Sequence, residues 1–547
     1  MALIGFDRIK GGFFAALLIA CCSSNAVSIL AASGSSEAPV GELRLGDYLQ
    51  KVLQFNESLQ AQLLETESSR LKWRAERGIF EPQLDSSITR EANRRTNNIL
   101  QEASQAGNML FDERNTIVDT GIDSLIPSGG KIHVGYTESD LVNNVNPFGN
   151  IITTSSAFYT RQYQTFAGVS LTQPLIKNGG LTPTLVSMRV AALDSDIAFE
   201  QYRRQLMLTV SRAETAYWNF YFTQEQLRFF DDSVSVAQRV LEDSREKLKA
   251  GQGSELDMMQ AQSDLALCQT KRNEAQQDCY DTVQTMKTLT GTWPAPNLAG
   301  PTTEPRLHAS DVPHQTCALI SYTDGFTMAT QLNPDYRIQQ QKIKQEKLRL
   351  GYAKNQLLPE LDLKTAYGFN GLGLTPGDSW AMAQTGNFPS WSVDLELIVP
   401  LGGNIKARNL LKAERVNLTE AYMNLHGVLS EIGNNLFIAI QKAQTCTNSI
   451  QSYQMVVHYN EELLKTELER LKAGTIGGHK VLEAEADLLE ARQDLAKALV
   501  KYQRTLTEVE LADGSLLKSR NLETTRDELR RRAATLTRVS HRSGAGF

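Results

Sequence analysis

The chain of 547 residues lacks the long apolar segments of a polytopic helical membrane protein. After residue 34, no uncharged apolar run approaches the roughly 18 residues that a transmembrane helix requires. If the mature protein crosses a membrane, strands in a closed barrel must therefore do so. The net charge of -6 argues against nucleic-acid binding. Proline is scarce, with 16 residues, which leaves room for long helices.

Six cysteines give no disulfide or metal framework, and those beyond residue 34 are interpreted as unpaired structural thiols. Residues 1–34 have the features of a secretory signal, because two basic residues precede the apolar run 11–20. Leu18 to Cys21 has the pattern of a lipobox, which would place a lipid on Cys21. Cleavage at the small residues 26–28 is the competing interpretation, and an uncleaved membrane anchor is the third.

The most informative feature is an internal duplication. Asn56 to Asp85 aligns with Asn333 to Asp362 without a gap, and Glu246 to Gly251 aligns with Glu469 to Gly474. The first predicted repeat covers residues 35–291, with a helix over 46–79, strands over about 82–174, a long helix over 183–250 and a helix over 256–290. After a linker over 292–325, the second repeat covers 326–516, with a helix over 326–357, strands over about 359–400, a long helix over 405–473 and a helix over 479–512. A basic tail of low order is predicted over 517–547.

The predicted long helices exceed the width of a compact domain. No Gly or Pro lies between Pro183 and Gly251, so about 67 residues can form one helix of about 100 Å. Two of the shorter helices, placed end to end, match this length. The last helix carries two displaced apolar stripes, which indicates neighbours on two sides and favours a ring of helices over a two-stranded coiled-coil rod.

The predicted strands alternate apolar and polar residues over about ten positions. Trp391 to Val399 is the clearest run in the second repeat, and Tyr159 to Leu171 in the first. This pattern fits a membrane barrel with a wet lumen, although a soluble sandwich is the alternative. Four strands cannot close a barrel, so several chains must contribute. A further hairpin over 115–139 has no counterpart in the second repeat.

This order of elements resembles the TolC-like outer-membrane efflux channels over about residues 43–514. The resemblance is carried by Gln173–Leu175, Asn333–Pro334, Pro400–Gly403 and the two Leu-Lys-Ala-Gly turns. It implies an α+β membrane protein in the outer membrane, with a long α-helical barrel and a transmembrane β-barrel formed by a homotrimer. Each chain would supply four of twelve strands. A periplasmic adaptor and an inner-membrane pump would be the partners, and the 115–139 hairpin departs from this pattern.

The resemblance further implies a pore closed at its periplasmic end by polar side chains near the helix turns. The matching positions are Asp257, Lys480 and Glu483, of which Glu483 would form a cation-attracting ring. Lys480 departs from the carboxylate of the family and could pair with Asp257 as an ionic latch. The alternatives are a capping box at Ser254–Asp257 and plain solvated surface at Lys480 and Glu483.

Both Leu-Lys-Ala-Gly turns fit two roles, as helix C-caps with left-handed glycine and as the landing surface of the adaptor. Their residues are Lys249, Ala250, Gly251, Lys472, Ala473 and Gly474. No catalytic motif, cofactor or metal site is predicted, since His479 and Glu483 alone are weak evidence for a metal. We therefore expect an exit duct for tripartite efflux or type I secretion, with a secreted or lipid-anchored helical structural protein as the alternative.

Overall fold

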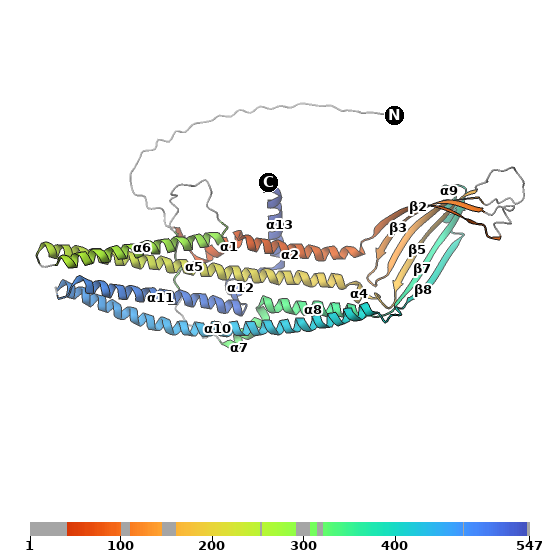
Figure 1. Cartoon of the computed structure of the whole chain (residues 1–547). Helices are drawn as coiled ribbons and strands as arrows, with labels where there is room; N and C mark the ends of the chain where they lie inside the picture. The colour runs from red at the N-terminus through yellow and green to blue at the C-terminus, as the bar shows by residue number, and fades with distance from the viewer. Residues whose placement is uncertain are drawn as a thin grey trace, which may run out of the picture.

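The computed structural model describes residues 41–99, 110–144, 160–251, 254–291, 307–313, 321–473 and 475–543. The signal segment and the lipidation candidate Cys21 lie outside these ranges, as does Gly474 of the second turn. The described chain is elongated, with a body of long helices at one end and a curved sheet at the other (Figure 1). Within the described ranges, no helix is both long and apolar enough to cross a membrane.

Two antiparallel helix hairpins make up the part of the body farther from the sheet (Figure 1). Helix α5 (Val186–Lys249) turns back into α6 (Glu255–Leu289), and α10 (Ile405–Lys472) turns back into α11 (Gly478–Ala512). With 64 and 68 residues, α5 and α10 are each about 100 Å long. A short helix α4 (Leu181–Thr184) contains Pro183, so the long helix begins at Val186 rather than at 183.

The part of the body nearer the sheet is completed by shorter helices, and here two predictions were wrong. The single helices expected over 46–79 and 326–357 are each interrupted at an asparagine. The observed elements are α1 (Leu45–Phe55), α2 (Glu57–Ala75) and the 3-10 turn η1 (Glu76–Phe80) in the first repeat, and α7 (Tyr322–Leu332) and α8 (Pro334–Asn355) in the second.

The interruptions have the same cause at both positions. Asn56 and Asn333 adopt extended backbone angles, and each side chain accepts a backbone N–H of the following helix. The Asn56 amide oxygen accepts the Leu59 N–H at 3.0 Å. Pro334 follows Asn333 at the first helical position, where its missing N–H is tolerated. An N-cap ends one helix and starts the next, so a continuous helix is excluded.

The sheet has six antiparallel strands in the order β2-β3-β4-β5-β7-β8. They are β2 (Gln83–Thr96), β3 (Leu110–Leu125), β4 (Lys131–Asn143), β5 (Thr160–Pro174), β7 (Glu360–Gly373) and β8 (Pro389–Ile398). The hairpin expected over 115–139 is part of this sheet, because β3 and β4 pair from Glu113–Asn143 to Leu125–Lys131. Four strands per chain, as the resemblance implied, is therefore wrong for this protein.

The two faces of the sheet differ in chemistry. Residues that share one face through the strand register are apolar and exposed: Leu84, Ile88, Ile122, Val134, Val169, Tyr367, Trp391, Val393, Leu395 and Leu397. We call this set the apolar face. The opposite face carries polar residues, including Asp119, Ser170 and the ion pair of Lys364 Nζ with Glu396 Oε2 at 2.6 Å. Alternation with period two produces both faces.

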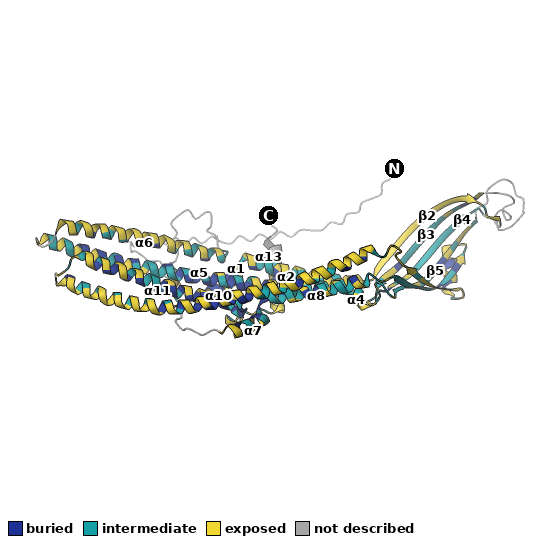
Figure 2. Ribbon diagram, turned by 60° about the horizontal axis from the view of Figure 1, so that its bottom comes forward, coloured by how far each residue is buried: buried dark blue, intermediate teal, exposed yellow. Residues whose placement is uncertain are grey.

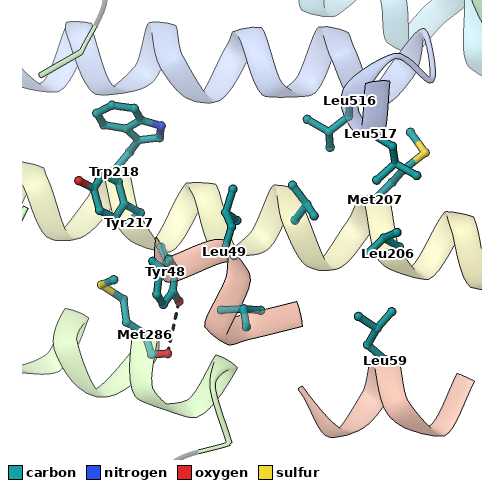
Figure 3. Close-up of a cluster of buried hydrophobic side chains, with 14 of the residues drawn as sticks. Tyr48, Leu49, Leu59, Leu206, Met207, Tyr217, Trp218, Met286, Leu516 and Leu517 are labelled. Atoms are coloured by element: carbon teal, nitrogen blue, oxygen red, sulfur yellow. Dashed lines mark hydrogen bonds between the residues drawn. The ribbon is translucent and has the colours of Figure 1, made fainter. Parts of the chain in front are cut away.

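The largest buried cluster lies in the middle of the helical body, where short and long helices meet (Figures 2 and 3). Tyr48 of α1 lies against Tyr217 of α5, and its hydroxyl donates to the Met286 carbonyl at 3.3 Å. Burial raises the pKa of the Tyr48 phenol. Beside this cluster, β1 (Gly41–Leu43) and β6 (Leu307–Ala309) form a small parallel sheet that the sequence did not predict.

The basic tail is ordered as far as the structure describes it, which corrects the expectation of low order. It forms α12 (Leu516–Ser519) and α13 (Arg526–Ser543). Leu516 and Leu517 are buried in the central cluster, close to Met207 (Figure 3), and Leu529 and Ala533 are buried as well. Burying each leucine stabilises the fold by roughly 1.5–3 kcal/mol. Apolar residues between the arginines therefore anchor this segment to the helical body.

Candidate functional site

The turns of the two helix hairpins lie at the same end of the molecule, far from the sheet (Figure 1). In the first turn, Ala250 ends α5 and its N–H donates to the Glu246 carbonyl at 3.0 Å. Gly251 follows with φ of +72°, the left-handed conformation that glycine adopts without strain. Lys249, Ala250 and Gly251 are all exposed. The turn is thus both a helix cap and an accessible surface.

The second turn is built in the same way as far as it is described. Ala473 ends α10, and its N–H donates to the Glu469 carbonyl at 3.0 Å. The Thr475 N–H and hydroxyl both donate to the Arg470 carbonyl, at 3.0 and 2.9 Å. Lys472 and Ala473 are exposed. We call residues 249–251 and 472–473 the tips.

A small apolar cluster holds the two hairpins together just behind the tips. It comprises Val240, Leu241, Ala261, Leu471 and Val481, which come from all four helices of the two hairpins. Gly478, at the start of α11, lies against α5 so closely that a Cβ there would sit 2.7 Å from Val240 Cγ1. The close approach of α11 to α5 therefore requires glycine at this position.

The three predicted pore residues are exposed and lie near the tips. Lys480 Nζ lies 2.8 Å from Glu483 Oε2 on the same helix, so within one chain Lys480 pairs with Glu483 rather than with Asp257. The hydrogen bond from Lys480, and then its charge, lowers the pKa of Glu483. The Ser254 hydroxyl caps α6 by accepting the Leu256 N–H at 3.2 Å, whereas the reciprocal Ser254–Asp257 capping box stays a prediction.

Two features were not predicted because they depend on contacts between helices; of their residues, only His479 was named above, as a weak metal candidate. His479 faces α6, where its Nδ1 lies 3.3 Å from Gln260 Nε2 and 3.9 Å from Asp264 Oδ2. Glu485 is buried on α11, and burial raises the pKa of its carboxyl. Across the described ranges, no three His, Cys, Asp or Glu side chains are grouped to hold a metal ion.

Comparison with solved structures identifies the fold. The fold matches the CmeC outer membrane channel of Campylobacter jejuni with a TM-score of 0.58 and 15% identity, covering 86% of each chain. It also matches the open MtrE outer membrane channel of Neisseria gonorrhoeae, with a TM-score of 0.55 and 15% identity, over 88% of this chain and 91% of that one. Paired long helices with a sheet at one end are thus the fold of outer-membrane channels.

The family follows from sequence. The model of the outer membrane efflux protein family matches residues 135–292 and 326–515, and the chain belongs to this family. The toluene efflux pump outer membrane protein TtgC of Pseudomonas putida is 24% identical over 358 residues, 63% of this chain and 68% of that protein. The antibiotic efflux pump outer membrane protein ArpC of the same species is 23% identical over the same shares. The predicted resemblance is confirmed.

The protein is therefore an outer-membrane efflux channel, as the sequence predicted, and its family is one of transport proteins rather than enzymes. The alternative of a helical structural protein is set aside by this membership. A conduit makes and breaks no bonds, so its selectivity depends on the side chains that line its narrowest ring. The structural features that bear on this are the tips, the pore candidates behind them and the chemistry of the sheet.

Proposed function

We propose that three copies of this chain surround a common pore and that their sheets form one transmembrane barrel. The support is that β2 and β8 are unpaired edges of the six-stranded sheet, and such edges invite pairing with another chain. Six strands from each of three copies give eighteen, a size that leaves an aqueous channel. The apolar face would then meet lipid and the polar face would line the lumen.

The helical bodies of three copies form the periplasmic tunnel in this proposal. Each of the two repeats, 35–291 and 326–516, supplies one hairpin and one shorter helical segment, so the trimer carries six similar tips. The tips are the surface that a periplasmic adaptor contacts, with an inner-membrane pump behind it. Exposure of Lys249, Lys472 and their neighbours supports this role, because neither turn is covered by its own chain.

The gate lies immediately behind the tips. Asp257, Lys480 and Glu483 would point toward the three-fold axis and form the narrowest ring. The pairing of Lys480 with Glu483 within one helix supports a partly neutralised ring rather than a latch to Asp257. His479 links α11 to α6 and would hold the two hairpins in the closed arrangement. Opening then requires the hairpins to separate at the cluster around Val240 and Val481.

The transported compounds are small molecules in this proposal, because the similar pump components TtgC and ArpC are named for toluene and antibiotics. The observation that carries the proposal is the pair of exposed tips at one end, about 100 Å of helix away from a sheet with an exposed apolar face. In the same outer membrane, Cys21 would carry a lipid anchor if residues 18–21 are processed as a lipobox.

The test is deletion of the gene followed by complementation. The deletion strain should become sensitive to toluene and to tetracycline-like drugs, and the full chain should restore resistance and form trimers that resist heat in detergent. Gly251→Val should keep the trimers but fail to restore resistance, whereas Gly402→Ala, where a Cβ meets nothing within 4 Å, should restore it. Resistance restored by a chain that remains monomeric would refute the proposal.

A further inference from the structure

A nine-residue helix, α9 (Pro376–Gln384), connects β7 to β8 at the end of the sheet farther from the helical body (Figure 1). It starts at a cap in which the Thr375 hydroxyl accepts the Asp378 N–H at 3.2 Å. The helix does not project away from the barrel end as a loop would. Instead it folds back and packs on β7 and β5.

Two glycines make this packing possible. A Cβ on Gly371 would lie 1.8 Å from the Ser379 carbonyl oxygen, and one on Gly373 would lie 2.5 Å from the Ser379 nitrogen. The hydroxyls of Ser379 and Thr165 are hydrogen-bonded and buried. Backbone therefore rests directly on backbone, and any side chain at Gly371 would lift the helix from the sheet. A contact this close indicates a fixed position for α9.

The strand register shows which face α9 covers. Gly371 and Thr165 are paired, and Gly371 lies on the same face as Tyr367, a member of the apolar face. Trp380 of α9 stacks edge-on against Tyr136 of β4, with ring centroids 5.0 Å apart. The helix thus sits on the apolar face, outside the lumen. In the strand order, β4 and β5 are interior strands, whereas β7 pairs with β8 only from Glu360 to Phe369, so at the level of Gly371 it forms the edge of the sheet.

The outward side of α9 carries large apolar side chains that the described part of the chain does not cover. Trp380 is 40% exposed and Met382 is 38% exposed, although Ser379 and Ala383 beneath them are buried. The flanking residues Leu374 and Phe388 are 80% and 52% exposed. Asp378 and Gln384 of α9 are exposed as well, so the helix presents an amphipathic surface in which Trp380 and Met382 are the large apolar side chains.

The apolar face ends at the level of α9, because Glu138 of β4 pairs with Thr165 on this same face. Further toward the outer end of β5, Arg161 lies on this same face and forms an ion pair with Asp140 of β4, with Nη2–Oδ2 at 2.5 Å. The helix therefore marks the boundary between an apolar band and a charged rim. Tryptophan and tyrosine favour such boundaries in membranes, because their rings are apolar and their N–H or O–H groups are polar.

We propose that α9 is a lipid-binding helix, which inserts Trp380 and Met382 among the acyl chains of the outer leaflet and fixes the depth of the barrel rim. This inference rests on the proposed function, since it needs the apolar face to meet lipid. Lipid is the occupant because Trp380 and Met382 are exposed on the same side of the sheet as the apolar face. A second copy would meet this chain along β8, next to α9, so the test below distinguishes contact with lipid from contact with that copy.

The test is photo-crosslinking of the full chain in the outer membrane of growing cells. The probe p-benzoylphenylalanine is placed at residue 380 on α9, at residue 391 within the apolar face and at residue 392 on the polar face. Lipopolysaccharide adducts are expected at 380 and 391 and none at 392. An adduct joining two copies at 380 would overturn the inference, and so would the absence of any adduct at 380 when 391 reacts with lipid.

The same experiment separates failure of this inference from failure of the proposed function. If residue 391 also gives no lipid adduct, the apolar face does not meet lipid and the barrel itself is refuted. Gly371→Ala should abolish the adduct at 380 while leaving the adduct at 391, because the new Cβ displaces α9. Gly377→Ala is the matched control, since its Cβ would have its nearest neighbour at 4.0 Å and should leave both adducts intact.

Discussion

Arg520 of the tail and Glu214 of α5 form a two-point ion pair, with Nε–Oε1 at 2.6 Å and Nη2–Oε2 at 3.2 Å. The Glu214 carboxylate is 1% exposed and also accepts the Thr507 hydroxyl at 2.6 Å. The tail is thus tied to the long helix by a charge that has no access to water. Such pairs hold a segment in place chiefly because breaking them leaves a buried charge.

Glu214→Ala should therefore release the tail. Arg520 is 30% exposed and keeps its pair with Glu510, so the loss is smaller than the roughly 3–5 kcal/mol of a fully buried pair. A loss of about 1.4 kcal/mol or more corresponds to at least ~10-fold faster hydrogen exchange in the tail if it opens locally. The measurement is amide exchange of α12 and α13 by mass spectrometry. Lys442→Ala is the control, because its pair with Glu508 is about half exposed and should change exchange little. Unchanged exchange in Glu214→Ala would show that apolar contacts alone hold the tail.

Gly478→Ala should push the hairpins apart behind the tips. The added Cβ would lie 2.7 Å from Val240 Cγ1, and overpacking of this kind costs about 1–3 kcal/mol. We expect a lower thermal midpoint and a larger conductance of trimers in planar bilayers. Adding Val240→Ala should reverse both effects, since it removes the clashing methyl group.

The control for Gly478→Ala is Gly351→Ala in α8, where a Cβ meets nothing within 4 Å. Alanine favours a helix interior by up to about 1 kcal/mol over glycine, so stability should stay the same or rise. A conductance change in Gly351→Ala equal to that of Gly478→Ala would contradict the explanation by steric contact.

Lys480→Gln should make the pore more selective for cations. The lysine now hydrogen-bonds Glu483 and lowers the pKa of its carboxyl. Without it, Glu483 loses its neutralising charge and its pKa returns upward toward the ordinary range, so the proposed ring of three carboxylates carries more net negative charge at neutral pH. Reversal potentials under a salt gradient should shift toward cation selectivity at neutral pH, and this selectivity should be lost at a higher pH than in the wild type.

Lys497→Gln provides the matched loss of charge farther along α11, about 25 Å from Lys480. Its reversal potential should equal that of the wild type. Equal shifts in both variants would mean that net charge, rather than the ring at Glu483, sets the selectivity.

The long helices and the sheet faces could be predicted because their signals are local. Absence of Gly and Pro between residues 183 and 251 permits α5, and period-two alternation distinguishes the two faces of each strand. The breaks at Asn56 and Asn333 also had a local signal, an N-cap residue before a helix. The duplication aligned these two positions with each other, but the helix breaks that such N-cap residues cause were not predicted.

What could not be predicted depends on partners distant in sequence. Strands β1 and β6 are three residues long, which is too short to show an alternation of apolar and polar residues, and they pair Gly41 with the distant Leu307. The tips were found through a repeated motif, whereas Gly478 matters only because Val240 lies opposite it on another helix. Glu485 looks like any surface glutamate of a helix until packing against α5 buries it.

Glu485→Gln should stabilise the helical body at neutral pH. Burial raises the pKa of Glu485, with the Arg492 charge opposing and the Asp232 charge adding to the rise. The folded protein thus holds this proton more tightly than the unfolded chain does. The contribution of this proton to stability is then complete in acid and is lost as pH rises from the ordinary glutamate range through the raised pKa. Glutamine has no proton to lose, so the variant should lack this loss.

The measurement is the thermal midpoint of detergent-solubilised trimers between pH 4 and pH 8. The midpoints of Glu485→Gln and wild type should coincide at the acid end and separate as the pH rises, with the variant higher. Glu490→Gln removes the same charge from an exposed position of α11 and should follow the wild type throughout. Parallel curves for Glu485→Gln and wild type would show that the buried carboxyl does not contribute to the pH dependence.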